Sequence, residues 1–132
     1  MSFSLFAFTI KLKRMRDYQK LDVWKKSHLM VLHIYKVVLP SFPAHEKYDL
    51  HSQVKRAAYS VPLNIVEGAG RNSEADFARF LDMALGSCHE AEYACMLARD
   101  LRYLNDEKYL QINTKTNEVK AMLIGLLKRL RH

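Results

Sequence analysis

Four stretches of this sequence repeat apolar residues at steps of three and four, and this spacing constrains the fold more than any other feature. The stretches cover residues 21–38, 50–68, 77–98 and 109–130. Apolar side chains at such steps share one face of an α-helix, and that face has to be buried against a partner. Because the connections between the stretches are short, successive helices are expected to be antiparallel neighbours. The sequence therefore predicts an all-α fold, an antiparallel up-down-up-down four-helix bundle.

The first predicted helix is apolar on most of its sides. Its buried stripe is expected to consist of Leu21, Trp24, His28, Val31, Tyr35 and Val38. Further apolar side chains, among them Leu29 and Leu32, lie off that stripe. A helix of this kind has more apolar surface than one neighbour can cover. The pattern therefore favours self-association or a deep central position for this helix.

Few helix-breaking residues interrupt the four stretches. The whole chain has only four Gly and three Pro, which favours helices over a turn-rich β fold. Pro40 is expected to end the first helix, and Ser73 with Asp76 forms a variant of the capping box at the start of the third. Pro62 lies inside the second stretch and removes one backbone donor, so a kink or a local break is expected there.

The positive charge of the chain is concentrated near its two ends. The formal net charge is +7, of which residues 1–20 contribute +4. Residues 21–132 contribute the remaining +3, which equals the charge of Lys128, Arg129 and Arg131. In an up-down-up-down bundle the start of the first helix and the end of the fourth share one end. The sequence predicts a basic pole that binds phosphates; the alternative is solvated terminal charge, since Lys and Arg favour a last helical turn.

The first 14 residues are set apart from the bundle. Their apolar run precedes its charges, has no recognisable cleavage site and is far too short to span a bilayer. We expect residues 1–14 to be a poorly ordered arm, or an extension ahead of a start at Met15, and residues 15–132 to form the bundle. Cys88 and Cys95 lie about two helical turns apart, too far for a disulfide. Two buried thiols fit a reducing, cytoplasmic location.

Known catalytic and metal-binding patterns do not match the helical spacing. A di-iron bundle needs Glu-x-x-His pairs, and a zinc hydrolase helix needs His-Glu-x-x-His, where this chain has Asp49 after His45 and Glu46. We therefore expect no enzyme activity, no metal and no cofactor. Four polar residues inside the pattern are assigned a structural role, by satisfying backbone groups near Pro62 or bonding between the second and third helices. They are Asn64, Glu67, Ser87 and Glu90.

Three motifs resemble one known family. They are the run over residues 16–26, the run over residues 53–68 with its Ser-x-Pro-x-Asn-Ile-x-Glu-Gly segment, and the group over residues 80–90. Together they resemble the four-helix-bundle proteins encoded in intervening sequences of bacterial 23S ribosomal RNA genes, over essentially Met15 to the C-terminus. The resemblance implies a ring-like homopentamer. It also implies kinship with the accessory protein of diversity-generating retroelements, which binds nucleic acid and a reverse transcriptase.

These observations predict a non-enzymatic, oligomeric, nucleic-acid-binding accessory protein, with RNA as the expected ligand. Three of the candidate phosphate contacts, Lys55, Arg56 and Arg71, are implied by the resemblance, and the others by the charge distribution. The candidates are Lys13, Arg14, Arg16, Lys20, Lys55, Arg56, Arg71, Lys128, Arg129 and Arg131. The alternative is a protein scaffold or adaptor for a nucleic-acid-handling enzyme, without direct contact to nucleic acid.

Overall fold

The computed structural model describes residues 17–46 and 48–131 and contains four long helices, with no strand in those ranges. The prediction of an all-α fold is confirmed. The long helices are α2 (Asp22–His33), α3 (Leu50–Ala69), α4 (Glu74–Asp100) and α5 (Asp106–Leu130). Short helical turns accompany them: η1 (Tyr18–Lys20), η2 (Ile34–Val38), η3 (Leu39–Ser41) and η4 (Ala44–Glu46). The predicted arm of residues 1–14 lies outside the described residues.

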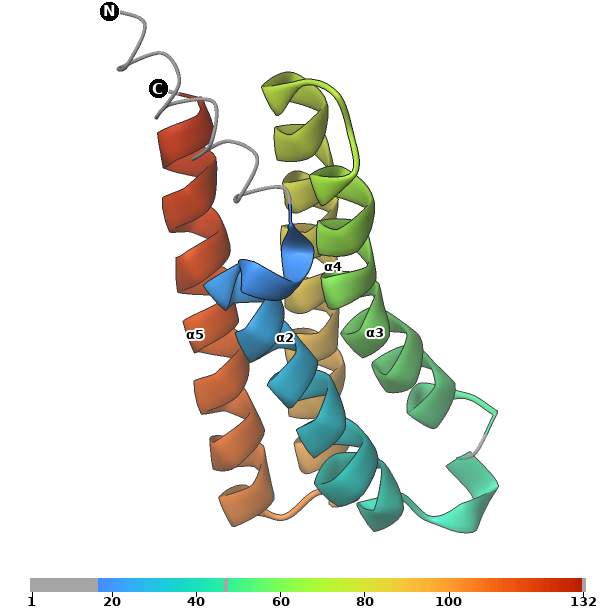
Figure 1. Cartoon of the computed structure of the whole chain (residues 1–132). Helices are drawn as coiled ribbons and strands as arrows, with labels where there is room; N and C mark the ends of the chain where they lie inside the picture. Colours follow the sequence, from blue (N-terminus) through green and yellow to red (C-terminus); the bar gives the residue numbers. More distant parts are fainter. Residues whose placement is uncertain (1–16, 47, 132) are drawn as a thin grey trace, which may run out of the picture.

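The four helices lie side by side as a bundle (Figure 1). Both α2 and α4 pack against α3, and both pack against α5. The pairs α2 with α4 and α3 with α5 are therefore on the diagonals of the bundle. This arrangement determines which helix faces can meet the same ligand.

The helix ends follow the capping signals in the sequence. Ser73 Oγ accepts a hydrogen bond of 3.1 Å from the backbone N–H of Asp76, and Asn105 caps α5 in the same way. The backbone N–H of Gly70 bonds to carbonyls of the last turn of α3. At Pro62, however, α3 continues without interruption. The expected local break is therefore absent, and the expected kink stays a prediction.

Three of the four predicted core stripes are buried as expected. In the stretch 77–98 the predicted stripe at steps of three and four consists of seven residues of α4, and all of them are buried: Phe77, Leu81, Ala84, Cys88, Ala91, Cys95 and Ala98. The stripes of α3 and α5 are buried at most of their positions, and their remaining members are half-buried. The hydrophobic core therefore lies where the sequence pattern of these three helices places it.

The predicted stripe of α2 is wrong by one position around the helix. Its buried side chains are Val23, Ser27, Met30, Ile34 and Val38, whereas Trp24 is half-buried and His28 and Tyr35 are exposed. Ser27 is fully buried because its hydroxyl donates a 2.8 Å hydrogen bond to the carbonyl of Trp24. With its polar group satisfied, a small serine fits against the core. The aromatic side of α2 is thereby turned toward the surface.

Helices α3 and α4 approach each other closely at Gly68. A Cβ added there would lie 2.8 Å from Cβ of Phe80 and 3.0 Å from Cδ1 of Phe77. Contacts below 3.0 Å require something to shift, and Cβ of Phe80 cannot move without its backbone. Glycine at this position therefore sets the distance between the two helices.

Both cysteine thiols are buried in the interior of the bundle, as predicted. Cys88 Sγ lies 3.6 Å from the carbonyl oxygen of Thr116 on α5, to which it donates. Burial raises the pKa of each thiol to about 12. Both side chains remain neutral and act as small apolar residues.

His33 is a half-buried polar residue at the end of α2. Its Nε2 atom is buried and has no hydrogen-bond partner among the described residues. Burial, and next the charge of Lys115 on α5, lower the pKa of His33 below its usual 6.5. The folded protein therefore resists protonation of this imidazole.

Acidification from about pH 7.5 to about pH 5.5 is expected to destabilise the native protein more than the His33→Gln variant. The unfolded chain takes up a proton at His33 below about pH 6.5, while the folded chain does so only at lower pH. The free energy of unfolding is thus unaffected by His33 above that value and falls as the pH drops through it. Urea titrations of both proteins at the two pH values measure this difference. Equal pH dependence in the two proteins contradicts the prediction.

Candidate nucleic-acid interface

Seven of the ten predicted phosphate-binding residues fall within the described residues, and they occupy four separate places. Lys20 belongs to η1, Lys55 and Arg56 to α3, and Arg71 to the connection between α3 and α4. The last turn of α5 and the residue after it hold Lys128, Arg129 and Arg131. The other three predicted residues, Lys13, Arg14 and Arg16, lie outside the described residues. The described residues are thus spread over the bundle.

Of the predicted basic pole, the structure describes only Lys20 and the end of α5, so the pole itself stays a prediction. Helix α5 has 25 residues, whereas α2 and η2 together span 17. Lys26 Nζ in α2 lies 3.0 Å from Oε1 of Glu118, which is near the middle of α5. In Figure 1 the blue η1 turn accordingly lies beside the middle of α5, while the C-terminus lies at its end. Because α2 begins halfway along the bundle, Lys20 is separated from the basic end of α5.

The basic residues at the end of α5 are partly compensated. Arg131 donates two hydrogen bonds to the carboxylate of Asp82 on α4, one of them 3.0 Å long. These hydrogen bonds raise the pKa of Arg131. Lys128 and Arg129 are exposed in the last turn, where cations favour the carbonyl end of a helix. Part of this basic cluster therefore stabilises the bundle, because Arg131 joins α5 to α4.

Arg71 contacts an aromatic ring. Its guanidinium carbon lies 4.6 Å from the ring centroid of Phe80, and that of Arg79 lies 4.8 Å from the same centroid. Such cation–π contacts hold both arginines against α4. Arg71 as a whole residue remains exposed.

The remaining predicted bases lie on the side formed by α2 and α3. The side chain of Lys20 is 68% exposed, although its Nζ is 3.9 Å from the Asp17 carboxylate. Lys55 and Arg56 are exposed on α3, and Lys55 Nζ lies 5.9 Å from the ring centroid of Tyr35 on η2. This contact joins the basic residues of α3 to the aromatic side of α2.

Sequence reasoning missed two further bases on this side, Lys25 and Lys36. Both are exposed. They are eleven residues apart, three turns of an α-helix, and so share one side of the segment. These two lysines could have been identified from the sequence. To find them, the charges must be counted for each face of each predicted helix instead of by position along the chain.

Counted by helix, the charge separates α4, which is acidic, from the other long helices, of which α5 carries five basic and three acidic residues. The segment from Asp22 to Val38 carries three basic residues and one acidic residue, and α3 carries two basic and one acidic. Helix α4 carries six acidic residues and two basic ones. Because α2 and α4 are diagonal, a polyanion is attracted to the α2 side and repelled from the α4 side.

The four predicted structural polar residues lie on α3 and α4, which pack against each other. Asn64 Nδ2 donates a 2.8 Å hydrogen bond to the carbonyl of Ser60, in the turn of α3 that contains Pro62. Ser87 is half-buried, and Glu67 and Glu90 are exposed. Asn64 thus bonds to a backbone group close to the proline, within its own helix.

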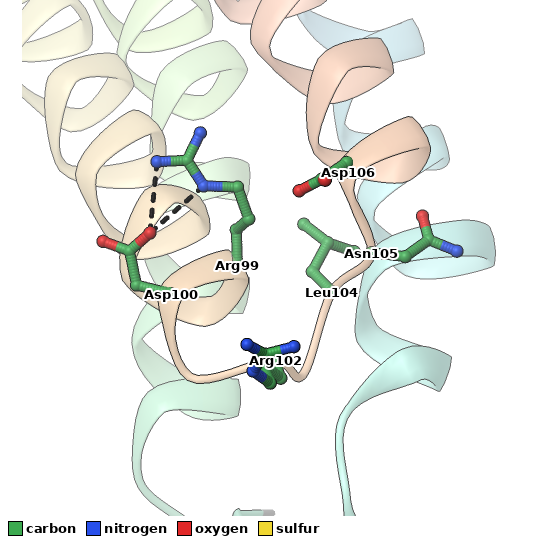
Figure 2. Close-up of a pocket in the computed structure, with 6 residues that line it drawn as sticks. All are labelled: Arg99, Asp100, Arg102, Leu104, Asn105 and Asp106. Atoms are coloured by element: carbon green, nitrogen blue, oxygen red, sulfur yellow. Dashed lines mark hydrogen bonds and ion pairs between the residues drawn. The ribbon is translucent and has the colours of Figure 1, made fainter.

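A pocket of about 500 Å³ lies where α4 is connected to α5 (Figure 2). Its lining is Arg99, Asp100, Arg102, Leu104, Asn105 and Asp106. Figure 2 shows Arg99 turned to Asp100, and their side chains are joined by a 3.1 Å hydrogen bond. The lining carries two positive and two negative charges, so its electrostatics do not select an anion.

Two further properties complete the description of the surface. Among the residues the structure describes, no three His, Cys, Asp or Glu side chains are grouped so as to hold a metal ion. Within the same residues, none of the helices is both long and apolar enough to cross a membrane. The exposed basic residues of α2 and α3 therefore remain the candidate interface.

Comparison with known proteins gives a family match and a structural match. The family model described as "23S rRNA-intervening sequence protein" matches residues 19–125. A crystal structure of a protein of unknown function from the S23 ribosomal protein family of Bacteroides thetaiotaomicron superposes with a TM-score of 0.75. That protein is 29% identical over 80% of this chain and 98% of its own length. No curated protein matches the sequence.

Proposed function

Because the chain belongs to the 23S rRNA-intervening sequence protein family, we propose that it is a non-enzymatic, oligomeric accessory protein that binds nucleic acid, with RNA as its ligand. The observation that carries the proposal is the division of charge between the α2 and α4 sides. Lys20, Lys55 and Arg56 are exposed on the basic side, within the part of the chain that matches the family. The family's name associates it with ribosomal RNA, which supports RNA as the nucleic acid.

Binding of this kind depends on phosphate contacts. Lysine and arginine side chains neutralise phosphates and release condensed counterions, so affinity falls steeply as salt is added. Such contacts position the nucleic acid without reading its sequence. We therefore expect the protein to bind many RNAs at low salt through its α2–α3 side. We expect this binding to take place in the cytoplasm.

Assembly into a ring-like homopentamer of antiparallel bundles is part of the proposal. Figure 1 supports the antiparallel order, because the α3–α4 and α4–α5 connections lie at opposite ends of the bundle. Exposed apolar side chains on α3 and α4 supply a surface for self-association: Leu63 is 49% exposed and Tyr93 is 59% exposed. A ring repeats the basic side of each subunit, which increases avidity for a long polyanion.

Titration of a labelled, unstructured RNA against the protein at several salt concentrations tests the proposal. The Lys55→Gln/Arg56→Gln variant is expected to bind more weakly and to show a salt slope about 1.4 smaller, which corresponds to two lost phosphate contacts. The matched control is Arg79→Gln/Arg99→Gln, which removes the same charge from the acidic α4 helix. Its affinity is expected to stay close to that of the native protein. Absence of binding even at low salt would falsify the proposal.

A second candidate function is favoured by the acidic side. Helix α4 combines six acidic residues with the exposed side chains of Met83 and Tyr93. A surface of this composition suits a basic protein partner such as a nucleic-acid-handling enzyme. Pull-down with and without nuclease separates the two functions, because a partner retained after nuclease treatment is held by protein contacts.

A further inference from the structure

The exposed side of α2 carries a row of aromatic rings. The Tyr18 and Trp24 rings meet edge to face with centroids 5.1 Å apart, and Trp24 and His28 stack at 5.1 Å with 5° between their planes. Tyr18 and Trp24 are half-buried against the core, while His28 is exposed. The stack thus begins in the interior and ends on an imidazole at the surface.

Tyr35 continues the same row one step further. It lies seven residues after His28, about two helical turns, and is 41% exposed. Lys55 from α3 approaches its ring, so the row runs along the boundary between α2 and α3. Four- and seven-residue steps place Trp24, His28 and Tyr35 on one side of the segment.

Positive charge borders this row. The exposed bases along it are Lys20, Lys25, Lys36, Lys55 and Arg56. Between Leu50 and Val66, α3 has no acidic residue, and the only acid between Asp22 and Val38 is Asp22 itself. Asp22 precedes Trp24 by two residues, which turns it to the other side of the helix.

From this juxtaposition we infer that the row is a stacking platform for the unpaired bases of single-stranded RNA. This inference rests on the proposed function and specifies its ligand. Proteins that bind single strands combine a basic track for the backbone with aromatic faces on which bases stack, independently of sequence. A base extends the stack on the His28 face turned away from Trp24, and a second base meets Tyr35. The neighbouring lysines and Arg56 hold the phosphates between them.

The first test compares two probes of equal charge and length: an oligouridine RNA and an abasic ribose-phosphate oligomer. The His28→Ala/Tyr35→Ala variant is expected to bind oligouridine about 10-fold more weakly or worse and to bind the abasic oligomer unchanged. The His28→Phe variant keeps a flat ring and is expected to retain oligouridine affinity. Leu110→Ala, which truncates an exposed apolar residue (65%) on α5, serves as the control and leaves both affinities unchanged.

The single tryptophan gives an independent readout. Because Trp24 lies under His28, a base that joins the stack is expected to quench its fluorescence, whereas the abasic oligomer is not. Equal affinity of the native protein for both probes overturns the inference and leaves the proposed function standing. Absence of binding to either probe at low salt overturns both. A change of molecular mass in light scattering on His28→Ala/Tyr35→Ala, with oligouridine affinity unchanged, shows a subunit contact and also overturns the inference.

Discussion

Replacing Phe77 by alanine is expected to lower the free energy of unfolding by about 3–5 kcal/mol, the usual cost of emptying a buried phenylalanine site. Phe77 is 1% exposed in the first turn of α4 and packs against Gly68 of α3. A chain of this size has a total stability of roughly 5–15 kcal/mol, so the variant loses a large part of it. Thermal unfolding followed by circular dichroism is expected to shift down by roughly 10–20 °C.

The control for this prediction is Leu110→Ala. Leu110 is 65% exposed on α5, so its truncation changes the free energy of unfolding by less than about 0.5 kcal/mol. Both variants are measured at one protein concentration, because assembly makes apparent stability depend on concentration. A Phe77→Ala protein as stable as Leu110→Ala contradicts the described packing of α4.

The Gly68→Ala variant is expected to lose about 1–3 kcal/mol of stability, although alanine is the better helix former. The added methyl group would lie 2.8 Å from Cβ of Phe80, which belongs to the backbone framework of α4. Helices α3 and α4 must then move apart, and the side chains between them lose contact. Urea unfolding at equilibrium measures the change.

Gly86→Ala is the matched control, with an expected change of opposite sign. Gly86 also lies inside a helix, but an added Cβ there has nothing within 4 Å. The substitution removes backbone freedom from the unfolded chain and stabilises the protein by about 0.5–1 kcal/mol. If Gly68→Ala also stabilises the protein, the two helices are further apart than the structure describes.

The sequence predicted the helices well wherever apolar and polar positions alternate clearly. In α4 the buried positions are alanine, cysteine, leucine and phenylalanine at steps of three and four, and every charged residue of the helix lies outside that face. In α2 apolar residues occur on most sides, and the pattern alone does not choose between neighbouring faces. The choice depends on Ser27, whose burial requires its hydrogen bond to the Trp24 carbonyl. A polar residue satisfied by its own helix is not visible in a pattern of hydrophobicity.

The candidate site was predicted less well, for a geometric reason. The predicted basic pole placed the start of the first helix and the end of the last at one end of the bundle, whereas Lys26 of α2 lies beside Glu118, near the middle of α5. Where a helix starts depends on its packing as much as on its caps. The acidic character of α4, by contrast, could have been counted from the sequence once the helix was located. The acidic charge of α4 bears on the position of the RNA site because α4 lies diagonal to α2. That diagonal arrangement is known only from the packing of the helices.

The burial of both thiols has a practical consequence. Cys88 and Cys95 are the only cysteines of the chain, and in the folded protein neither presents a thiolate to a maleimide dye. A single cysteine introduced at Gly86 or Leu29 will therefore be the one site that takes up label in the otherwise native sequence. Its labelling rate, with and without RNA, then reports which side of the bundle is covered.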